Sequence, residues 1–199
     1  MQPNSIDSGR AFLKDSIRRT IDFSGTEQSR GIPPPAPEKP FEPGAKRIDL
    51  PDCTTSGHFS CKGLASAISN RESCRSYSGA AISLEELSFL LWATQGVRLR
   101  IDEHHALRTV PSAGCRHALE TYLSVHRVTG LEKGIYRFLP LEHQLVFEAS
   151  IENIEKKTAW AALGQHFAGT AAVTFIWTAI PRRMEWRYGL AAHKVIALD

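Results

Sequence analysis

The stretch Leu107–Tyr122 reads L-R-T-V-P-S-A-G-C-R-H-A-L-E-T-Y, with a small-residue turn between a basic approach and a strand-like exit. The turn is Pro111-Ser112-Ala113-Gly114, where small side chains let backbone N–H groups approach a flat or anionic ligand. Gly114 also tolerates a positive φ, a conformation that costs other residues strain. Taken alone, the tetrapeptide predicts only a turn.

A second stretch, upstream, points to a ligand site. From Arg71 the chain reads R-E-S-C-R-S-Y, so that two guanidiniums, those of Arg71 and Arg75, flank the hydroxyl of Ser73. An arginine presents a planar fork of donors that suits a phosphate or a polyoxygenated ligand. The alternative is a solvated helix end whose arginines form salt bridges with Glu72 or Glu85.

Five motifs follow one another in a fixed order. After R-E-S-C-R-S-Y come S-L-E-E-L-S-F-L-L-W-A-T-Q-G-V, L-R-T-V-P-S-A-G, E-T-Y-L-S-V and G-I-Y-R-F, and this order resembles the nitroreductase-like flavoproteins. The chain is similar in particular to their SagB-type dehydrogenase branch, which includes enzymes that oxidise peptide azolines to azoles. The resemblance extends from about Arg71 to Asp199.

The resemblance implies an FMN cofactor, which itself supplies the redox chemistry, so no catalytic side chain or metal is required of the protein. The cofactor-binding residues that it implies are Arg71, Ser73, Arg75, Ser112, Ala113 and Gly114. Arg71 and Ser73 would lie near the phosphate and the ribityl chain, and Arg75 near the N1–O2 edge of the ring. The Ser112-Ala113-Gly114 backbone would approach the ring, in this family often from the partner subunit of a homodimer. Arg108 is a further candidate for an anion contact.

The same resemblance implies hydride transfer through flavin N5, with two classes of substrate. In a nitroreductase-like reaction, NAD(P)H reduces the flavin and an aromatic small molecule reoxidises it. In the azoline reaction, a peptide substrate reduces the flavin and oxygen reoxidises it. Both remain open.

Two features depart from the family pattern. Many members carry an amide side chain shortly after P-S, where this chain has Cys115 and Arg116. The family also continues beyond a segment like Tyr188–Asp199, so the nitroreductase-like domain is expected to be partial, with its C-terminal part missing. The alternative to an oxidoreductase is therefore a truncated, flavin-free remnant that acts as a binding or scaffold subunit.

The distribution of charge argues against a nucleic-acid partner. The formal net charge is only +3, and the basic residues are scattered rather than clustered. The short run Arg182-Arg183, with Arg187, predicts a helix surface. A metal site is not expected either: the spacing of Cys53, His58 and Cys61 matches no common zinc site. The other candidate, His104-His105 with the neighbouring acids, is expected to be a solvated loop.

The sequence also bears on the compartment. It has no signal-peptide pattern, and its most apolar run, Ala171–Ile180, is far shorter than the about 20 residues needed to span a bilayer. We therefore expect a cytoplasmic protein without a membrane partner. Cys74 and Cys115 are expected to be small buried hydrophobic residues in a reducing environment.

Composition divides the chain into an N-terminal extension over residues 1–63 and a partial nitroreductase-like domain over residues 64–199. In the extension, Phe12, Leu13, Ile17 and Ile21 predict one short amphipathic helix. Gly31–Pro43, which reads G-I-P-P-P-A-P-E-K-P-F-E-P, predicts an extended connector or a strap across a partner surface.

The second region predicts an α+β fold, a mainly antiparallel sheet flanked by helices. Leu64–Ile68 forms a helical stripe, and Ser83 with Glu86 forms a capping box for a helix that ends at Gly96. The other expected elements are a loop over Val97–Leu107, strands over Glu120–Val128, Gly134–Leu139, Gln144–Ala149 and Thr170–Ile180, and helices over Ile151–Gln165 and Met184–Leu198. The strand over Thr170–Ile180 is expected to be covered on both faces, because apolar residues occupy both its odd-numbered and its even-numbered positions.

Overall fold

The structure is a computed structural model that describes residues 5–52 and 63–199. It divides into two units. Unit 1 comprises Met1–Lys39, Arg98–Glu120 and Thr178–Asp199, and unit 2 comprises Pro40–Val97 and Thr121–Trp177. The expected division at residue 63 stays a prediction.

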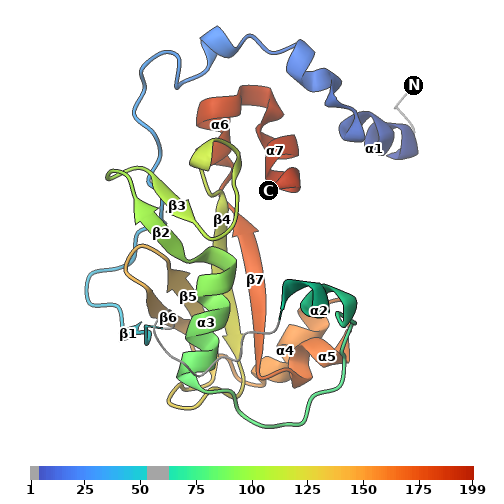
Figure 1. Cartoon of the computed structure of the whole chain (residues 1–199), viewed down its shortest axis with the longest axis vertical. Helices are drawn as coiled ribbons and strands as arrows, with labels where there is room; N and C mark the ends of the chain where they lie inside the picture. Colours follow the sequence, from blue (N-terminus) through green and yellow to red (C-terminus); the bar gives the residue numbers. More distant parts are fainter. Residues whose placement is uncertain (1–4, 53–62) are drawn as a thin grey trace. The chain divides into compact units, whose positions relative to one another are not determined.

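A five-stranded sheet with the order β1-β6-β5-β4-β7 is built mostly from residues of unit 2 (Figure 1). The pairs β1·β6, β6·β5 and β5·β4 are antiparallel. The strands are β1 Arg47–Asp49, β4 Leu119–Val125, β5 Gly134–Leu139, β6 Gln144–Ala149 and β7 Val173–Ala179. The predicted α+β fold with a mainly antiparallel sheet is thus confirmed, and β5 and β6 have the predicted bounds.

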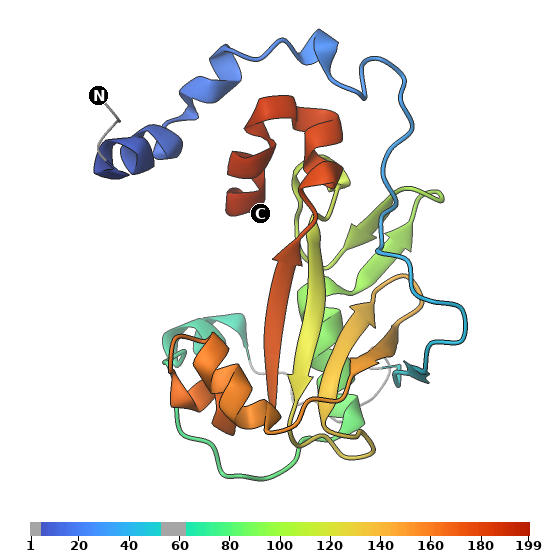
Figure 2. The same cartoon turned by 180° about the vertical axis from the view of Figure 1, so that it is seen from behind.

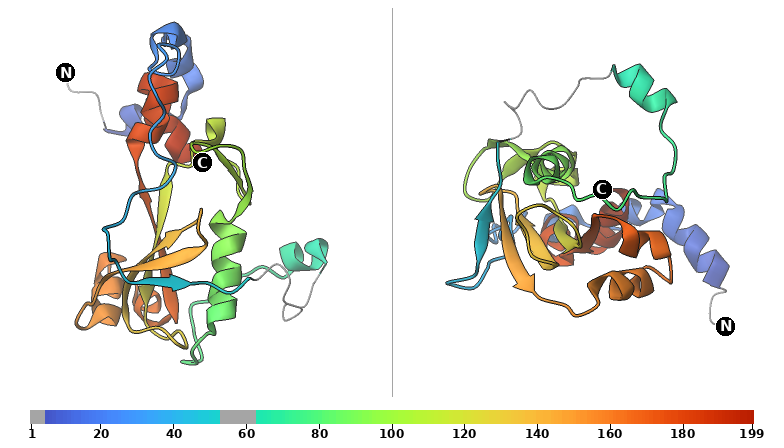
Figure 3. Two further views of the ribbon diagram at one scale, coloured as in Figure 1. Left: turned by 90° about the vertical axis from the view of Figure 1, so that its left-hand side faces the viewer. Right: turned by 90° about the horizontal axis from the view of Figure 1, so that it is seen from below.

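Alternation along the strands gives the sheet two different faces. Leu123 and Val125 of β4, like Tyr136 and Phe138 of β5, pack in one cluster with Leu87 and Leu91 of α3 (Leu84–Gln95). On the opposite face of the sheet, the Ser124 hydroxyl forms a hydrogen bond with the Thr158 hydroxyl of α4 (Ile154–Ala161) at 2.7 Å. Figure 3 (right) shows α3 on one side of these strands, and α4 with α5 (His166–Thr170) on the other.

The start of α3 follows the predicted capping box. The Ser83 hydroxyl accepts a hydrogen bond from the Glu86 N–H at 3.1 Å, and the Glu86 carboxylate accepts one from the Ser83 N–H at 2.7 Å. These two bonds satisfy N–H groups that have no partner inside the helix. Within α3, Leu90 is 42% exposed, whereas Ser88 is buried.

The C-terminal part of unit 1 forms two helices rather than the one predicted over Met184–Leu198. Helix α6 (Pro181–Tyr188) begins earlier, with Pro181 at a position where a missing N–H has no cost. It ends at Gly189, whose φ is +50°, and a turn of 3-10 helix leads into α7 (Ala192–Leu198). Ala118, Met184 and Ala192 form a small core there.

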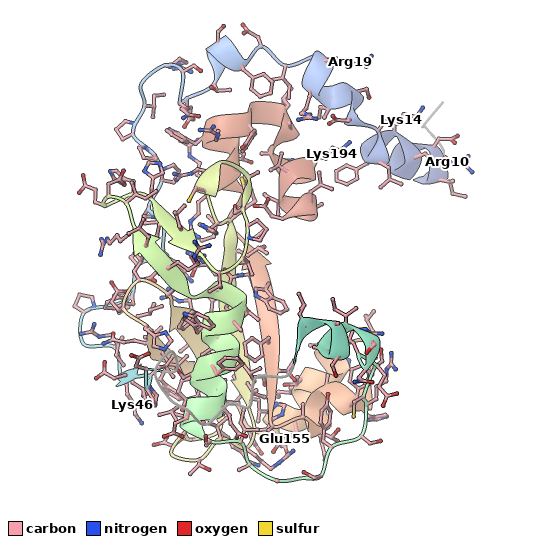
Figure 4. All side chains as sticks on the ribbon, in the orientation of Figure 1. Arg10, Lys14, Arg19, Lys46, Glu155 and Lys194 are labelled. Atoms are coloured by element: carbon pink, nitrogen blue, oxygen red, sulfur yellow. The ribbon has the colours of Figure 1, made fainter. Side chains whose placement is uncertain are left out.

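The N-terminal segment also differs from the single helix expected. It contains α1 (Ser5–Leu13) and the 3-10 helices η1 (Asp15–Arg19) and η2 (Phe23–Gly25). Lys14 has extended dihedral angles and interrupts the helix. The Lys194 ammonium of α7 lies at this interruption, where it donates to the carbonyls of Leu13 (3.2 Å) and Lys14 (Figure 4). Phe12 and Leu13 are exposed.

Two further expectations were wrong. The loop over Val97–Leu107 contains a hairpin of β2 (Val97–Arg100) and β3 (Ala106–Arg108), because Asp102 accepts hydrogen bonds from the N–H groups of His104 and His105 and closes the turn. Strand β7 is not covered on both faces: Ile176 is 39% and Trp177 47% exposed.

The proline-rich segment is irregular, as predicted, over residues 32–43. Within unit 1, residues 32–37 are held by hydrogen bonds from side chains to their backbone carbonyls, and we call them the strap. The strap follows the N-terminal segment (blue), which lies beside α6 and α7 (red) in Figure 2. Trp186 of α6, for example, donates to the Ile32 carbonyl at 2.7 Å.

Candidate functional site

The P-S-A-G turn of unit 1 contains the 3-10 helix η3 (Ala113–Cys115). Gly114 has a φ of +62°, as its place in the turn predicted. A Cβ atom there would lie 2.4 Å from Cδ of Arg187 and 2.8 Å from the Tyr188 hydroxyl. Glycine is therefore favoured twice, by the backbone conformation and by the close packing of α6 against the turn.

The turn binds a carboxylate in this structure. The Ser112 hydroxyl donates to one oxygen of the Asp199 side chain at 2.5 Å, and the Ala113 N–H donates to the other at 2.9 Å. The His117 N–H in turn donates to the Ser112 hydroxyl at 2.9 Å, which fixes its orientation. These paired donors show that the turn can hold an anionic or carbonyl-bearing group.

A pocket of about 380 Å³ adjoins the turn within unit 1. Its lining residues are Arg98, Leu107, Arg108, Thr109, Val110, Pro111, Ser112, Cys115 and His117. Burial and the neighbouring Arg183 guanidinium lower the pKa of Arg108 to about 10, against the opposing effect of Glu120. Arg108 is nevertheless charged at neutral pH, so the pocket favours anions.

A second pocket, of about 480 Å³, lies between α4 and the sheet in unit 2. Its lining includes Ile135, Ile154 and Phe175 and is almost entirely apolar. It offers few donors for a phosphate or an anionic ring edge, so the pocket beside the turn is the better candidate for the polar parts of a cofactor.

Cys115 lies in the turn but lacks a base. Its thiol donates to the Ala106 carbonyl at 3.0 Å and lies 3.7 Å from Nε2 of His117. That nitrogen is also 3.1 Å from the Ala106 carbonyl, which can only accept, so Nε2 carries the hydrogen and cannot take a proton from the thiol. The expectation that both cysteines are buried was wrong: Cys74 is exposed and Cys115 half-buried.

Two buried histidines make stability depend on pH. Burial, together with the Arg108 guanidinium, lowers the pKa of His117 to about 4, and burial also lowers the pKa of His126. Both imidazoles are neutral in the folded protein at neutral pH, whereas histidines of the unfolded chain take up protons below about pH 6.5. The free energy of unfolding is therefore at its full value above about pH 6.5 and decreases as the pH falls toward 4.

Urea unfolding at about pH 7.5 and about pH 5.0 tests this dependence. We expect a loss of about 2 kcal/mol from His117 alone at the lower pH. The His117→Gln variant has no titrating side chain at this position, so its free energy of unfolding should fall by correspondingly less between the two pH values. Stability that is constant or rises on acidification would contradict the assignment.

The Arg71–Arg75 segment lies in unit 2, in an irregular and exposed connection between α2 (Leu64–Ser69) and α3. The side chains of Arg71, Ser73 and Arg75 are all exposed. The Arg75 guanidinium lies 5.6 Å from the centre of the Phe167 ring of α5, a cation–π contact that orients it. Two exposed guanidiniums and a hydroxyl are a donor set that fits a phosphate group.

The predicted site residues thus form two groups, one in each unit. Ser112, Ala113 and Gly114 are together in unit 1, and Arg71, Ser73 and Arg75 are together in unit 2. The structure describes each group by itself: the turn presents donors to an anionic group, and Arg71 with Ser73 presents donors that fit a phosphate.

Sequence reasoning missed the buried charges of unit 1. Arg183, which we expected on a helix surface, is 1% exposed and pairs with Glu120 at 2.5 Å. Arg116 is 2% exposed and its guanidinium lies 4.9 Å from the centre of the Trp186 ring. Glu120, the one charged residue of β4, was the signal that could have indicated a buried partner.

Neither of the two candidate metal-binding groups is supported by the residues that the structure describes. Residues 5–52 and 63–199 contain no group of three or more histidine, cysteine or acidic side chains placed to hold an ion. His105 is instead hydrogen bonded through Nδ1 to Asp102 at 2.9 Å. Cys53, His58 and Cys61 lie outside the described residues.

The chain thus combines a mainly antiparallel sheet with flanking helices, a P-S-A-G turn that holds a carboxylate, and an exposed pair of arginines. The nitroreductase family model matches residues 68–199, so the chain belongs to the nitroreductase family. Members of this family generally use FMN.

Individual known proteins are also similar to this chain. A curated protein from Methanocaldococcus jannaschii, described as a "putative nitroreductase", is 35% identical over 136 residues, which are 68% of this chain and 66% of the relative. Crystal structures with the same description, from Anabaena variabilis and Ralstonia eutropha, share the fold at TM-scores of 0.60 and 0.59, with 22% and 24% identity. They align with 79% and 83% of this chain.

The chain spans only part of these relatives. It covers 66% of the length of the curated protein, 32% of the Anabaena chain and 73% of the Ralstonia chain. Among the described residues, no helix combines the length and the apolar character needed to cross a bilayer.

Proposed function

We propose that the chain binds FMN and functions as a flavin-dependent oxidoreductase of the SagB-type dehydrogenase group, as a homodimer in the cytoplasm. The observation that carries the proposal is the P-S-A-G turn, whose Ser112 hydroxyl and Ala113 N–H hold a carboxylate at the edge of a cationic pocket. Family membership and the exposed arginines of unit 2 support it.

The residues of the chain would bind and orient the cofactor. Arg71 and Ser73 would hold the phosphate and the ribityl chain, with Arg75 at the N1–O2 edge of the ring. A guanidinium at that edge stabilises negative charge on the ring. The Ser112 hydroxyl and the Ala113 N–H would donate to polar atoms of the ring in place of the Asp199 carboxylate. Bound FMN supplies hydride acceptance and donation at N5.

The activity test uses FMN-loaded protein, mixed without oxygen with NADH, NADPH or an azoline-containing peptide. We expect one of these donors to bleach the visible flavin band, and an aromatic acceptor or oxygen to restore it. A saturated, dimeric holoprotein that accepts hydride from none of them would refute the proposed activity.

Arg75 offers a test of the binding residues. Arg75→Ala should raise the dissociation constant for FMN about tenfold, which corresponds to the loss of about 1.4 kcal/mol from a charge-assisted contact. Arg47→Ala is the matched control, because Arg47 is also exposed, lies in unit 2 and stacks on a phenylalanine, with its guanidinium 5.0 Å from the Phe41 ring. FMN titration by fluorescence quenching measures both. Equal affinity in the wild-type protein and in Arg75→Ala would remove Arg75 from the site.

A further inference from the structure

The strap is bound to unit 1 through its backbone. Four of its carbonyls accept hydrogen bonds from side chains: Ile32 from Trp186 (2.7 Å), Pro35 from Arg116 (3.0 Å), Ala36 from Arg183 (2.9 Å) and Pro37 from Arg108 (3.3 Å). All four donors are buried, with at most 6% of each residue exposed. Because a buried donor without an acceptor is costly, these carbonyls are required partners of the arginines.

Proline suits this arrangement for a physical reason. An extended polyproline-like segment makes no internal hydrogen bonds, so its carbonyls are available to other donors. The fixed φ of proline also reduces the number of conformations that the unbound segment can adopt. The prolines at positions 33, 34, 35 and 37 therefore stiffen the segment whose carbonyls accept these hydrogen bonds.

Two of the anchoring arginines flank the P-S-A-G turn. Arg108 directly precedes residues 109–115, and Arg116 directly follows them. The strap carbonyls of Pro37 and Pro35 hold these two ends. A third anchor, Arg183, donates to the His117 carbonyl at 3.0 Å as well as to the strap.

The backbone of the turn needs such support. Gly114, Cys115 and His117 all have positive φ angles, of +62°, +57° and +44°. For residues other than glycine this conformation is strained, and it persists only where the surrounding structure imposes it. The anchors on either side are in position to impose it, together with the packing of α6 against Gly114.

We propose that the strap is a positioning device for the cofactor turn: by fixing Arg108 and Arg116, it holds residues 109–115 in the conformation that presents the Ser112 and Ala113 donors. The effect on FMN affinity rests on the proposed function, whereas the effect on the order of the turn does not. Residues 32–37 are then positioning residues, since the described hydrogen bonds connect them to the turn through arginine side chains.

Cys115 reports on the turn without any cofactor. We would treat the full-length protein with iodoacetamide and follow the modification of Cys115 by peptide mass spectrometry, with exposed Cys74 of unit 2 as the internal reference. Pro35→Gly and Pro37→Gly keep the carbonyls but loosen the strap, and each should raise the Cys115/Cys74 rate ratio about fivefold. Pro40→Gly is the matched control, because the Pro40 carbonyl is held by buried Arg137 in unit 2. It should leave the ratio within about twofold of the wild-type value.

Arg116→Met is a second, independent variant. It retains an unbranched side chain over the Trp186 ring, but it removes the donor to Pro35. We expect the same rise in Cys115 labelling in a protein that remains folded by circular dichroism. A Cys115/Cys74 ratio that is unchanged in Arg116→Met and in the two strap variants would overturn the proposal.

FMN titration of the same proteins separates the two proposals. Weaker FMN binding in Pro35→Gly and Pro37→Gly, but not in Pro40→Gly, is the expected result. If FMN binds to none of the proteins, including the wild type, while strap variants still label faster at Cys115, the positioning of the turn is supported and the proposed function fails. If FMN binds equally to all of them, the strap does not set the cofactor site.

Discussion

Arg183→Met should reduce the free energy of unfolding by about 3–5 kcal/mol, because it leaves the Glu120 carboxylate buried without its ion-pair partner. The two side chains are 2% and 3% exposed and 2.5 Å apart. The same guanidinium donates to the carbonyls of Ala36 and His117, which would also lose this donor. Urea unfolding of the variant and the wild type measures the loss.

Two further variants make the explanation specific. Arg182→Met removes the neighbouring arginine, whose pair with Glu27 is more exposed, and should cost no more than about 1 kcal/mol. Combining Arg183→Met with Glu120→Gln removes the unpaired charge and should recover at least about 2 kcal/mol, since the new amide oxygen could still accept from the Lys39 N–H. A single Arg183→Met variant as stable as Arg182→Met would show that the buried pair does not stabilise unit 1.

Gly169→Ala should destabilise unit 2 by about 2–3 kcal/mol through overpacking. A Cβ atom at this position of α5 would lie 2.2 Å from the Glu155 carbonyl oxygen and 3.2 Å from the Ala159 Cβ, both in α4. The obstacle is largely backbone, so the two helices would have to move apart. Phe167, the ring that carries the Arg75 guanidinium, lies in the same helix and would move with it.

Thermal unfolding of Gly169→Ala and of Gly9→Ala tests this packing. Gly9 also lies in a helix, α1, but a Cβ atom there would have no neighbour within 4 Å. Its replacement should be neutral or should stabilise the helix by up to about 1 kcal/mol. Equal melting temperatures for the two variants would contradict close contact between α4 and α5.

The parts of the fold that the sequence predicted are those set by local pattern. Strands β5 and β6 are short, largely apolar runs joined by a short polar connection, and α3 begins with a capping box, so local composition and capping define them. The hairpin of β2 and β3 was missed because its strands are short and rich in arginine, and because Asp102 stabilises its turn through its side chain. A hydrogen bond from the backbone of the turn to the Asp102 side chain cannot be predicted from the alternation of apolar residues.

Burial of charge was the least predictable feature. Arg183 and Arg116 occupy positions that composition assigns to the surface, and only tertiary structure brings Glu120 and the strap carbonyls to them. In the candidate site, the sequence predicted the turn and the positive φ of Gly114, and the cofactor-binding residues stay a prediction. The carboxylate held by Ser112 and Ala113 and the anchoring of Arg108 to Pro37 depend on contacts between distant segments, which no motif encodes.

The central claim, that this chain of the nitroreductase family binds FMN, is tested most directly by the visible absorption spectrum of the purified protein after incubation with FMN and desalting. We predict a retained flavin spectrum, which Arg75→Ala should weaken and Arg47→Ala should leave intact. A colourless protein that keeps no FMN after desalting would contradict the account and would favour a flavin-free binding or scaffold subunit.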